Sequence, residues 1–372
     1  MNQKVIDYQY KILYALGMIF IVQFHTGGGG VNIFNDWFRA FHLGLFMFVS
    51  GYFYNYDNEN HVVSFIKKKI IHLLIPLYVW NFIYGIFVLA LKHYGGFSIG
   101  GNFNLYNLVI APMQNGQHFA YNLSCWFLAP LIMVHIYNVV LRKFLRKIWS
   151  DGVNEWAFWL LNFALGLIAV YLSQAGYNHG AYLPFLRMMF FIPFYETGIL
   201  YKNHLKKYDN LDSLIYFSAI FIISLILIYF YKSVPYSNAA WLQFKQYPLY
   251  IPFIEGGLGI AFWLRISKIL LPAIGKSRYL NLIADNTWAI MMHQFIGFML
   301  VKLIFYGLYL YTPLCQNFSV QKFKTDKWYY YLPHQDMHML IIYAAAGIVV
   351  PIVIQYILDR IKMRFSLSFF NK

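Results

Sequence analysis

Stretches of apolar residues, each long enough to cross a bilayer, recur ten times along the chain. A helix needs about 20 apolar residues to cross a hydrocarbon core about 30 Å thick. The pattern therefore predicts an all-α integral membrane protein, a bundle of about ten transmembrane helices. The predicted spans are Tyr8–Thr26, Trp37–Tyr54, Ile70–Leu91, Ser124–Leu141, Trp156–Ser173, Phe185–Tyr201, Leu214–Tyr231, Pro248–Leu264, Thr287–Tyr311 and His338–Leu358.

Two of these spans are predicted to be short or broken. Pro193 interrupts the sixth, and Pro252 with the pair Gly256-Gly257 interrupts the eighth. The first apolar run reads as a retained helix because many similar runs follow it. Since there is no repeat, low-complexity segment or soluble region, the chain is expected to form one polytopic membrane domain over residues 1–372.

The composition agrees with lipid as the surrounding solvent. Hydrophobic residues make up 60% of the chain and charged residues only 12%, against roughly 25% charged residues in soluble domains. Aromatic residues reach 21%, which suits rings placed at the membrane interfaces. The two cysteines are too few for a disulfide framework, and no CxxC spacing is present.

The positive charge is a signal of topology. The net charge is +15, and 20 of the 29 lysines and arginines fall at the termini or in alternate short connections, within residues 4–11, 67–69, 142–147, 202–207, 265–278 and 360–372. By the positive-inside rule these segments lie in the cytoplasm, together with both termini. The excess of lysine and arginine therefore does not indicate a nucleic-acid partner.

Two connections on the predicted outer side are long and rich in aromatic and amide side chains. They cover Lys92–Leu123 and Thr312–Met337. Long loops usually carry function, and aromatic rings with amides suit a sugar, which has apolar faces and a rim of hydroxyls. Simple interfacial anchoring by Tyr and Trp is an equally good interpretation.

Ionisable residues inside apolar helices are costly and usually face the bundle interior or a cavity. His25 closes the first predicted helix, before the run Gly27–Gly30, and His42 begins the apolar part of the second. A short outer turn would bring both imidazoles close together, where a neutral ring can accept a proton from a hydroxyl. Alternatively, each ring only hydrogen-bonds a neighbouring helix. The other such residues are Lys11, His72, His135, Arg187, Glu196, Glu255, His293 and Lys302.

Three further interpretations stay open from the residues alone. The glycine run is either a close approach for a ligand or a loose helix end. Glu196 and Glu255 either pair with Arg187 or another buried cation, or relay protons. A metal site is not expected, because the HExxH motif does not occur.

Several segments together resemble the acyltransferase-3 family, membrane enzymes that move acyl groups from acyl-CoA to surface carbohydrate. His25 is similar to the helix-one histidine of that family. The stretch from Phe41-His42-Leu43 to Ser50-Gly51-Tyr52 is similar to its helix-two pattern, closest to the fucose-4-O-acetylase-like branch. The other matching segments are Lys67 to Pro76, Trp126-Phe127-Leu128 and Ile283 to His293.

The resemblance departs from the family pattern in two places. The family usually has Arg or Lys eleven residues before the helix-one histidine, where this chain has Tyr14. Lys11 lies three residues earlier, on the same helix face. The arginine pair entering helix three appears here as Lys69 and His72, which lack the bidentate fork of arginine.

The resemblance implies transfer of an acyl group, most simply acetyl from acetyl-CoA, to a hydroxyl of a surface or lipid-linked glycan. The expected location is the plasma membrane of a bacterium, with acyl-CoA, the glycan and the lipid bilayer as partners. His25 and His42 are the expected catalytic residues. The donor would be bound by Lys11, Lys67, Lys68, Lys69 and His72, and the acceptor by Trp126, Glu196 and His293.

Two other function classes are consistent with the residues. A transporter of a glycan or lipid-linked sugar would use helices broken near Pro193 and Gly256-Gly257, with Glu196 and Glu255 in the membrane. A purely structural subunit would need none of the buried ionisable residues.

Overall fold

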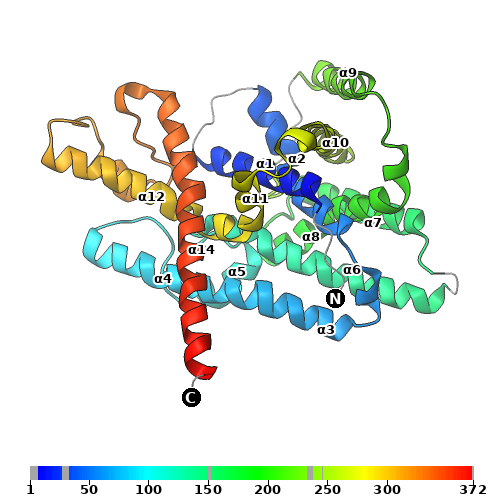
Figure 1. Cartoon of the computed structure of the whole chain (residues 1–372), viewed down its shortest axis with the longest axis horizontal. Coiled ribbons are helices and arrows are strands. Elements are labelled where there is room, and N and C mark those ends of the chain that lie inside the picture. The colour runs from blue at the N-terminus through cyan, green and yellow to red at the C-terminus, as the bar shows by residue number, and fades with distance from the viewer. Residues whose placement is uncertain (1–6, 27–32, 150–151, 233–237, 245, 371–372) are drawn as a thin grey trace.

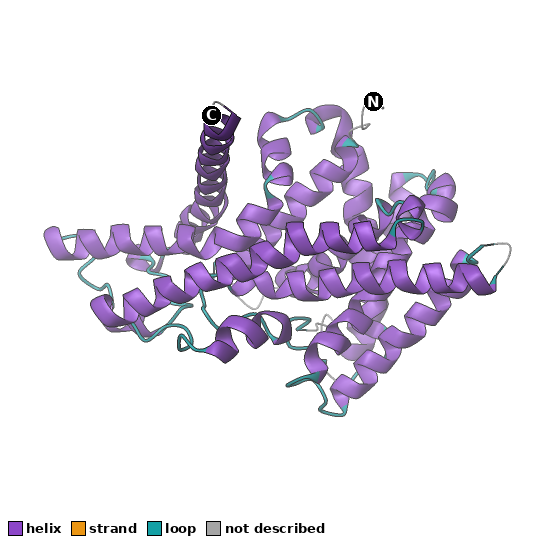
Figure 2. Ribbon diagram, turned by 90° about the horizontal axis from the view of Figure 1, so that it is seen from below, coloured by secondary structure: helices purple, strands orange, loops and turns teal. Residues whose placement is uncertain are grey.

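The computed structural model is a bundle of helices. It describes residues 7–26, 33–149, 152–232, 238–244 and 246–370, and the side chains of 33–40 and 364–370 lie outside that description. No β-strand forms in these ranges (Figures 1 and 2). The α-helices are α1 (Tyr8–His25), α2 (Ile33–Tyr52), α3 (Val62–Lys69), α4 (Ile75–Gly95), α5 (Ala111–Gln114), α6 (Leu128–Ile148), α7 (Glu155–Gln174), α8 (Tyr182–Leu200), α9 (Ser213–Tyr231), α10 (Ile251–Ile274), α11 (Arg278–Asp285), α12 (Thr287–Tyr311), α13 (Val320–Thr325) and α14 (Leu340–Phe370).

Each predicted span corresponds to a helix of the bundle. Among the described residues, eight helices are long and apolar enough to cross a membrane, and they confirm the all-α membrane class. α1 and α2 are not among the eight. α1 is 18 residues long but contains Gln9, Lys11 and Gln23, and only the part of α2 from Phe41 to Tyr52 counts as an apolar helix. Both pack inside the bundle, α1 beside α10 and α11 and α2 beside α8 (Figure 1).

The predicted breaks in the sixth and eighth spans are wrong. α8 continues through Pro193, where the Thr197 hydroxyl donates a 2.7 Å hydrogen bond to the Pro193 carbonyl. Pro252 lies in the first turn of α10, where a missing N–H costs nothing, and α10 then runs 24 residues through both glycines. The broken helices on which a transport function depended are therefore absent from the described chain.

The third span does contain an irregular turn. α3 and α4 form one continuous helix, Val62–Gly95, joined by a π-helical turn at Ile70–Leu74. Pro76 causes it, because proline cannot donate to the carbonyl four residues earlier and its ring would clash there. The wide turn lies directly after the predicted basic cluster, so it sets the direction in which Lys69 and Leu73 point.

α2 and α8 lie in backbone contact. A Cβ atom added to Gly51 would lie 1.8 Å from the Tyr195 carbonyl oxygen, and one added to Gly198 would lie 1.9 Å from the Phe48 carbonyl oxygen. Only glycine permits this approach at both positions. The contact fixes α2 against one of the two most buried membrane-spanning segments of the described chain.

Candidate active site

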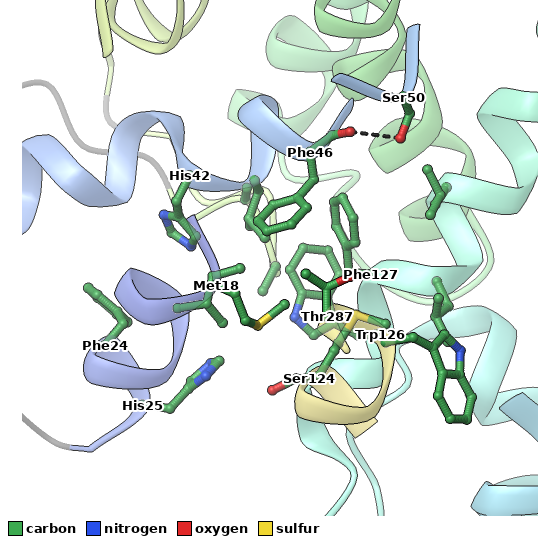
Figure 3. A pocket seen from close by; sticks show the side chains of 18 of the residues that line it. Met18, Phe24, His25, His42, Phe46, Ser50, Ser124, Trp126, Phe127 and Thr287 are labelled. Carbon is green, nitrogen blue, oxygen red and sulfur yellow. Dashed lines mark hydrogen bonds between the residues drawn. The ribbon is translucent and has the colours of Figure 1, made fainter. Parts of the chain in front are cut away.

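A cavity of about 280 Å³ lies between the first two helices, the start of α6 and the start of α12 (Figure 3). The segment before α10 also contributes to its wall. The lining residues are Tyr14, Met18, Ile21, Phe24, His25, His42, Leu43, Phe46, Ser50, Leu73, Ser124, Trp126, Phe127, Leu128, Leu131, Asn238, Ala239, Ala240, Thr287, Trp288 and Met291. None of them is acidic, and most are apolar.

The wall of this cavity combines residues from both ends of the bundle. Ser50 and Leu73 come from the end that is expected to face the cytoplasm. Asn238 comes from the opposite connection, and His25 lies at the last residue of α1. The lining of the cavity therefore includes residues from both ends of the bundle.

A hydrogen-bonded chain fixes the His25 ring. Its Nδ1 lies 3.1 Å from Oε1 of Gln294, and Nε2 of the same amide donates to the Ser124 hydroxyl at 2.6 Å. With the amide oxygen turned toward His25, the bond assigns the proton to Nδ1. The lone pair of the neutral ring is then on Nε2, the nitrogen that a reacting hydroxyl would approach.

The second long outer connection covers His25. The Tyr330 hydroxyl donates to the His25 carbonyl oxygen, and the Trp328 ring stacks on the imidazole with ring centroids 6.2 Å apart. Burial raises the pKa of the Tyr330 hydroxyl well above its usual value, so it stays protonated and remains a donor. This connection therefore contacts His25, although none of its residues lines the cavity.

His42 contributes the second imidazole of the cavity. It lies on α2, with the Phe24 ring stacked on it at a centroid distance of 5.8 Å. Figure 3 shows the rings of His25 and His42 entering the cavity from α1 and α2. The predicted proximity of the two histidines is therefore present, whereas the run Gly27–Gly30 between them lies outside the described residues.

Trp126 lies in the wall of the same cavity, at the turn that leads into α6. Arg187 from α8 packs over its ring, with the guanidinium carbon 4.6 Å from the ring centroid. His293, the other ring predicted to bind substrate, does not line the cavity. It is buried behind it, bound at Nδ1 to the Tyr84 hydroxyl at 2.7 Å, and Nε2 has no partner among the described residues.

Glu196 is placed in an ion-pair network rather than in the cavity wall. It lies 2.7 Å from the fully buried guanidinium of Arg142, which also binds both carboxylate oxygens of Glu155 at 2.8 and 2.9 Å. Asn138 donates to the other Glu196 oxygen. Of the interpretations left open by the sequence, this placement fits the structural ion pair, with Arg142 in place of Arg187. Glu255 is buried, and its Oε2 has no hydrogen-bond partner in the described chain.

The residues predicted to bind the donor divide into two groups. Lys67, Lys68 and His72 are exposed beside the π-helical turn. Lys69 turns inward instead, with Nζ 3.1 Å from Nε2 of His135. Lys11 does not line the cavity and forms a 2.8 Å salt bridge with Asp285.

Gln294 and Ser124 are site residues that the sequence analysis did not select. The search considered ionisable residues within the helices, and these two are neutral. A usable signal was present, because Gln294 is an amide in the middle of an apolar helix, where an unbonded polar group is expensive. No group of three His, Cys, Asp or Glu arranged to hold a metal ion occurs among the described residues.

Comparison with known proteins adds one match. A family model described as an acyltransferase domain matches residues 8–360. No curated protein and no solved structure matches the chain. The match covers all the residues of the cavity wall.

Proposed function

This chain belongs to the acyltransferase-3 family of membrane proteins, and on that premise we propose that it transfers an acetyl group from cytoplasmic acetyl-CoA to a hydroxyl of a surface or lipid-linked glycan. The observation that carries this proposal is the orientation of His25, with its basic nitrogen Nε2 left available by the bond from Nδ1 to Gln294. A bacterial plasma membrane is the proposed location.

In this mechanism His25 is the general base. Nε2 takes the proton of the acceptor hydroxyl as its oxygen attacks the thioester carbonyl, and the C–S bond then breaks. The CoA thiolate leaves and takes up the proton from the imidazolium, so the ring returns to its neutral form. General base catalysis of this kind contributes about 10²–10⁴-fold to the rate.

We assign to His42 the stabilisation of the oxyanion that forms at the thioester carbonyl. It lies in the same cavity wall as His25, and a donor aimed at developing charge is among the largest contributions to catalysis. The chemistry requires no carboxylate in the cavity, which agrees with a lining that contains none.

The donor is proposed to enter at the inner end of the cavity. Lys67, Lys68 and His72 are exposed there, and cationic donors bind phosphate oxygens by charge-assisted hydrogen bonds. Leu73 follows this cluster and already lines the cavity. A pantetheine arm leading from the phosphates could therefore pass Leu73 toward His25.

The acceptor is proposed to enter from the outer end. Trp126 and Asn238 both line the cavity there. An aromatic face suits the apolar side of a sugar ring. The resemblance of the segment from Phe41 to Tyr52 to the fucose-4-O-acetylase-like branch also supports a carbohydrate acceptor.

The test replaces His25 by Ala and measures two products. Purified wild-type protein should release CoA from acetyl-CoA, and the surface glycans of the expressing cell should carry acetyl esters visible by NMR. His25→Ala should reduce both by at least about 10²-fold. His179→Ala is the matched control, because His179 is an exposed ring of the outer connection after α7. Undiminished acetylation by a normally inserted His25→Ala protein would remove His25 from the mechanism.

A further inference from the structure

Arg187 is a buried cation whose bonds all go to neutral groups. Its side chain is only 1% exposed, and no carboxylate pairs with it among the described residues. Nε donates to the Ala240 carbonyl at 2.9 Å, and Nη2 donates to the same oxygen. Nη1 donates to the carbonyls of Gln114 and Asn115 at 3.2 and 3.4 Å.

These carbonyls come from two separate outer connections. Gln114 ends α5, in the connection before α6, whereas Ala240 belongs to the connection between α9 and α10. Asn178, from a third connection, donates to the carbonyls of Trp241 and Leu242, both at 3.2 Å. The Arg187 guanidinium therefore links two connections that lie far apart in the sequence.

The segments that Arg187 joins form the outer wall of the cavity. Asn238, Ala239 and Ala240 line the cavity, and so does Trp126, whose ring lies against the guanidinium. Arg187 thus contacts both Trp126 and the Asn238–Ala240 segment.

The free-energy cost of burying the Arg187 charge indicates that this arginine has a specific role. Burying a cation in a membrane protein costs several kcal/mol and is usually offset by a partner of opposite charge. Here the compensation comes from carbonyl dipoles, reached by a planar fork that lysine does not have. An apolar residue would avoid the cost but would leave three carbonyl groups of the outer wall without donors.

We propose that Arg187 is a positioning residue for the acceptor: it fixes Trp126 and the Asn238–Ala240 segment as one rigid subsite for the acceptor sugar. The inference rests on the proposed function and assigns the acceptor subsite to one end of the cavity. The donor end, at Leu73 and the exposed lysines, is independent of it. A misplacement of about 1 Å in such a wall can reduce a rate by up to about 10²-fold.

The test uses Arg187→Lys, which keeps the charge and removes the fork. Inverted membrane vesicles of the expressing cell, which contain its own glycan acceptors, are supplied with labelled acetyl-CoA. Arg187→Lys should reduce the rate of ester formation about tenfold and leave the KM for acetyl-CoA unchanged. Asn238→Ala, which removes a cavity-facing side chain without touching Arg187, should reduce the rate in the same manner if Arg187→Lys does not fold.

Arg265→Lys is the matched control. Arg265 is also a buried arginine, bound to the Leu211 carbonyl at 2.6 Å and stacked over the Tyr216 ring at 4.1 Å, but it pairs with Asp209 and lies away from the cavity. Arg265→Lys should change neither the rate of ester formation nor the KM for acetyl-CoA. An unchanged rate in a folded Arg187→Lys protein, or a loss accompanied by an equal rise in the acetyl-CoA KM, would overturn the inference. A wild-type protein that forms no ester would instead reject the proposed function.

Discussion

Gln294 of α12 holds the His25 ring, with 3.1 Å between Oε1 and Nδ1 and a separation of 269 positions in the sequence. Gln294 is fully buried and bound to Ser124 through its other amide atom. Its side chain therefore cannot rotate without breaking both bonds. The basic nitrogen of His25 is set by a neutral amide rather than by a carboxylate.

Gln294→Leu is expected to lower the turnover number by about 10–100-fold, with little change in the KM for acetyl-CoA. Leucine has a similar volume but does not accept a hydrogen bond, so the ring loses the bond that selects its tautomer; the loss of such supporting partners usually costs that much. Steady-state kinetics on the purified protein measure the effect.

Gln355→Leu is the control for this prediction. Gln355 lies on α14, where its amide donates to Asp359 one turn later, and it does not line the cavity, so its loss should leave turnover unchanged. A Gln294→Leu protein with the activity of the wild type would show that the His25 ring needs no fixed tautomer.

Lys67 and Lys68 should contribute to donor binding through charge. The double variant Lys67→Gln, Lys68→Gln is expected to raise the KM for acetyl-CoA several-fold without changing turnover, and added salt should reduce the difference from the wild type because both side chains are exposed. Initial rates at two ionic strengths test this. Lys322→Gln and Lys324→Gln, in α13 of the connection after α12, are the control. Equal salt dependence in all the proteins would contradict the donor site.

Arg142 should dominate the stability of the ion-pair network. Arg142→Met leaves the carboxylates of Glu155 and Glu196 without their buried cation, and breaking such a group by removing one partner costs about 3–5 kcal/mol. Thermal unfolding in detergent measures the loss. Arg146→Met should cost much less, because its side chain is 45% exposed where it pairs with Glu59. Equal losses in the two variants would show that the network contributes little.

Gly198→Ala should separate α2 from α8. The new Cβ would lie 1.9 Å from the Phe48 carbonyl oxygen, so the helices must move, at a cost of about 1–3 kcal/mol or more. Lower thermal stability and lower activity are both expected, since α2 carries His42 and Ser50. Gly307→Ala on α12 has open space around its Cβ and should be neutral. A Gly198→Ala protein as stable as Gly307→Ala would contradict the close contact.

The sequence alone predicted the helices, because apolar runs of membrane length can hardly form anything else in lipid. It also predicted that His25 and His42 lie close together, because a short turn between antiparallel helices brings the end of the first helix near the start of the second. It predicted the family from segments whose order matches along most of the chain. These features depend on local composition and on short sequence separations.

Only the tertiary structure decided which distant residues meet. Arg142 rather than Arg187 pairs with Glu196, Lys11 pairs with Asp285 outside the cavity, and Gln294 reaches His25. Pro193 does not break α8, which runs on to Leu200 while packed against α2 and α7. The packing of helices far apart in the chain sets these partners, and the apolar pattern of each helix defines its length but not its neighbours.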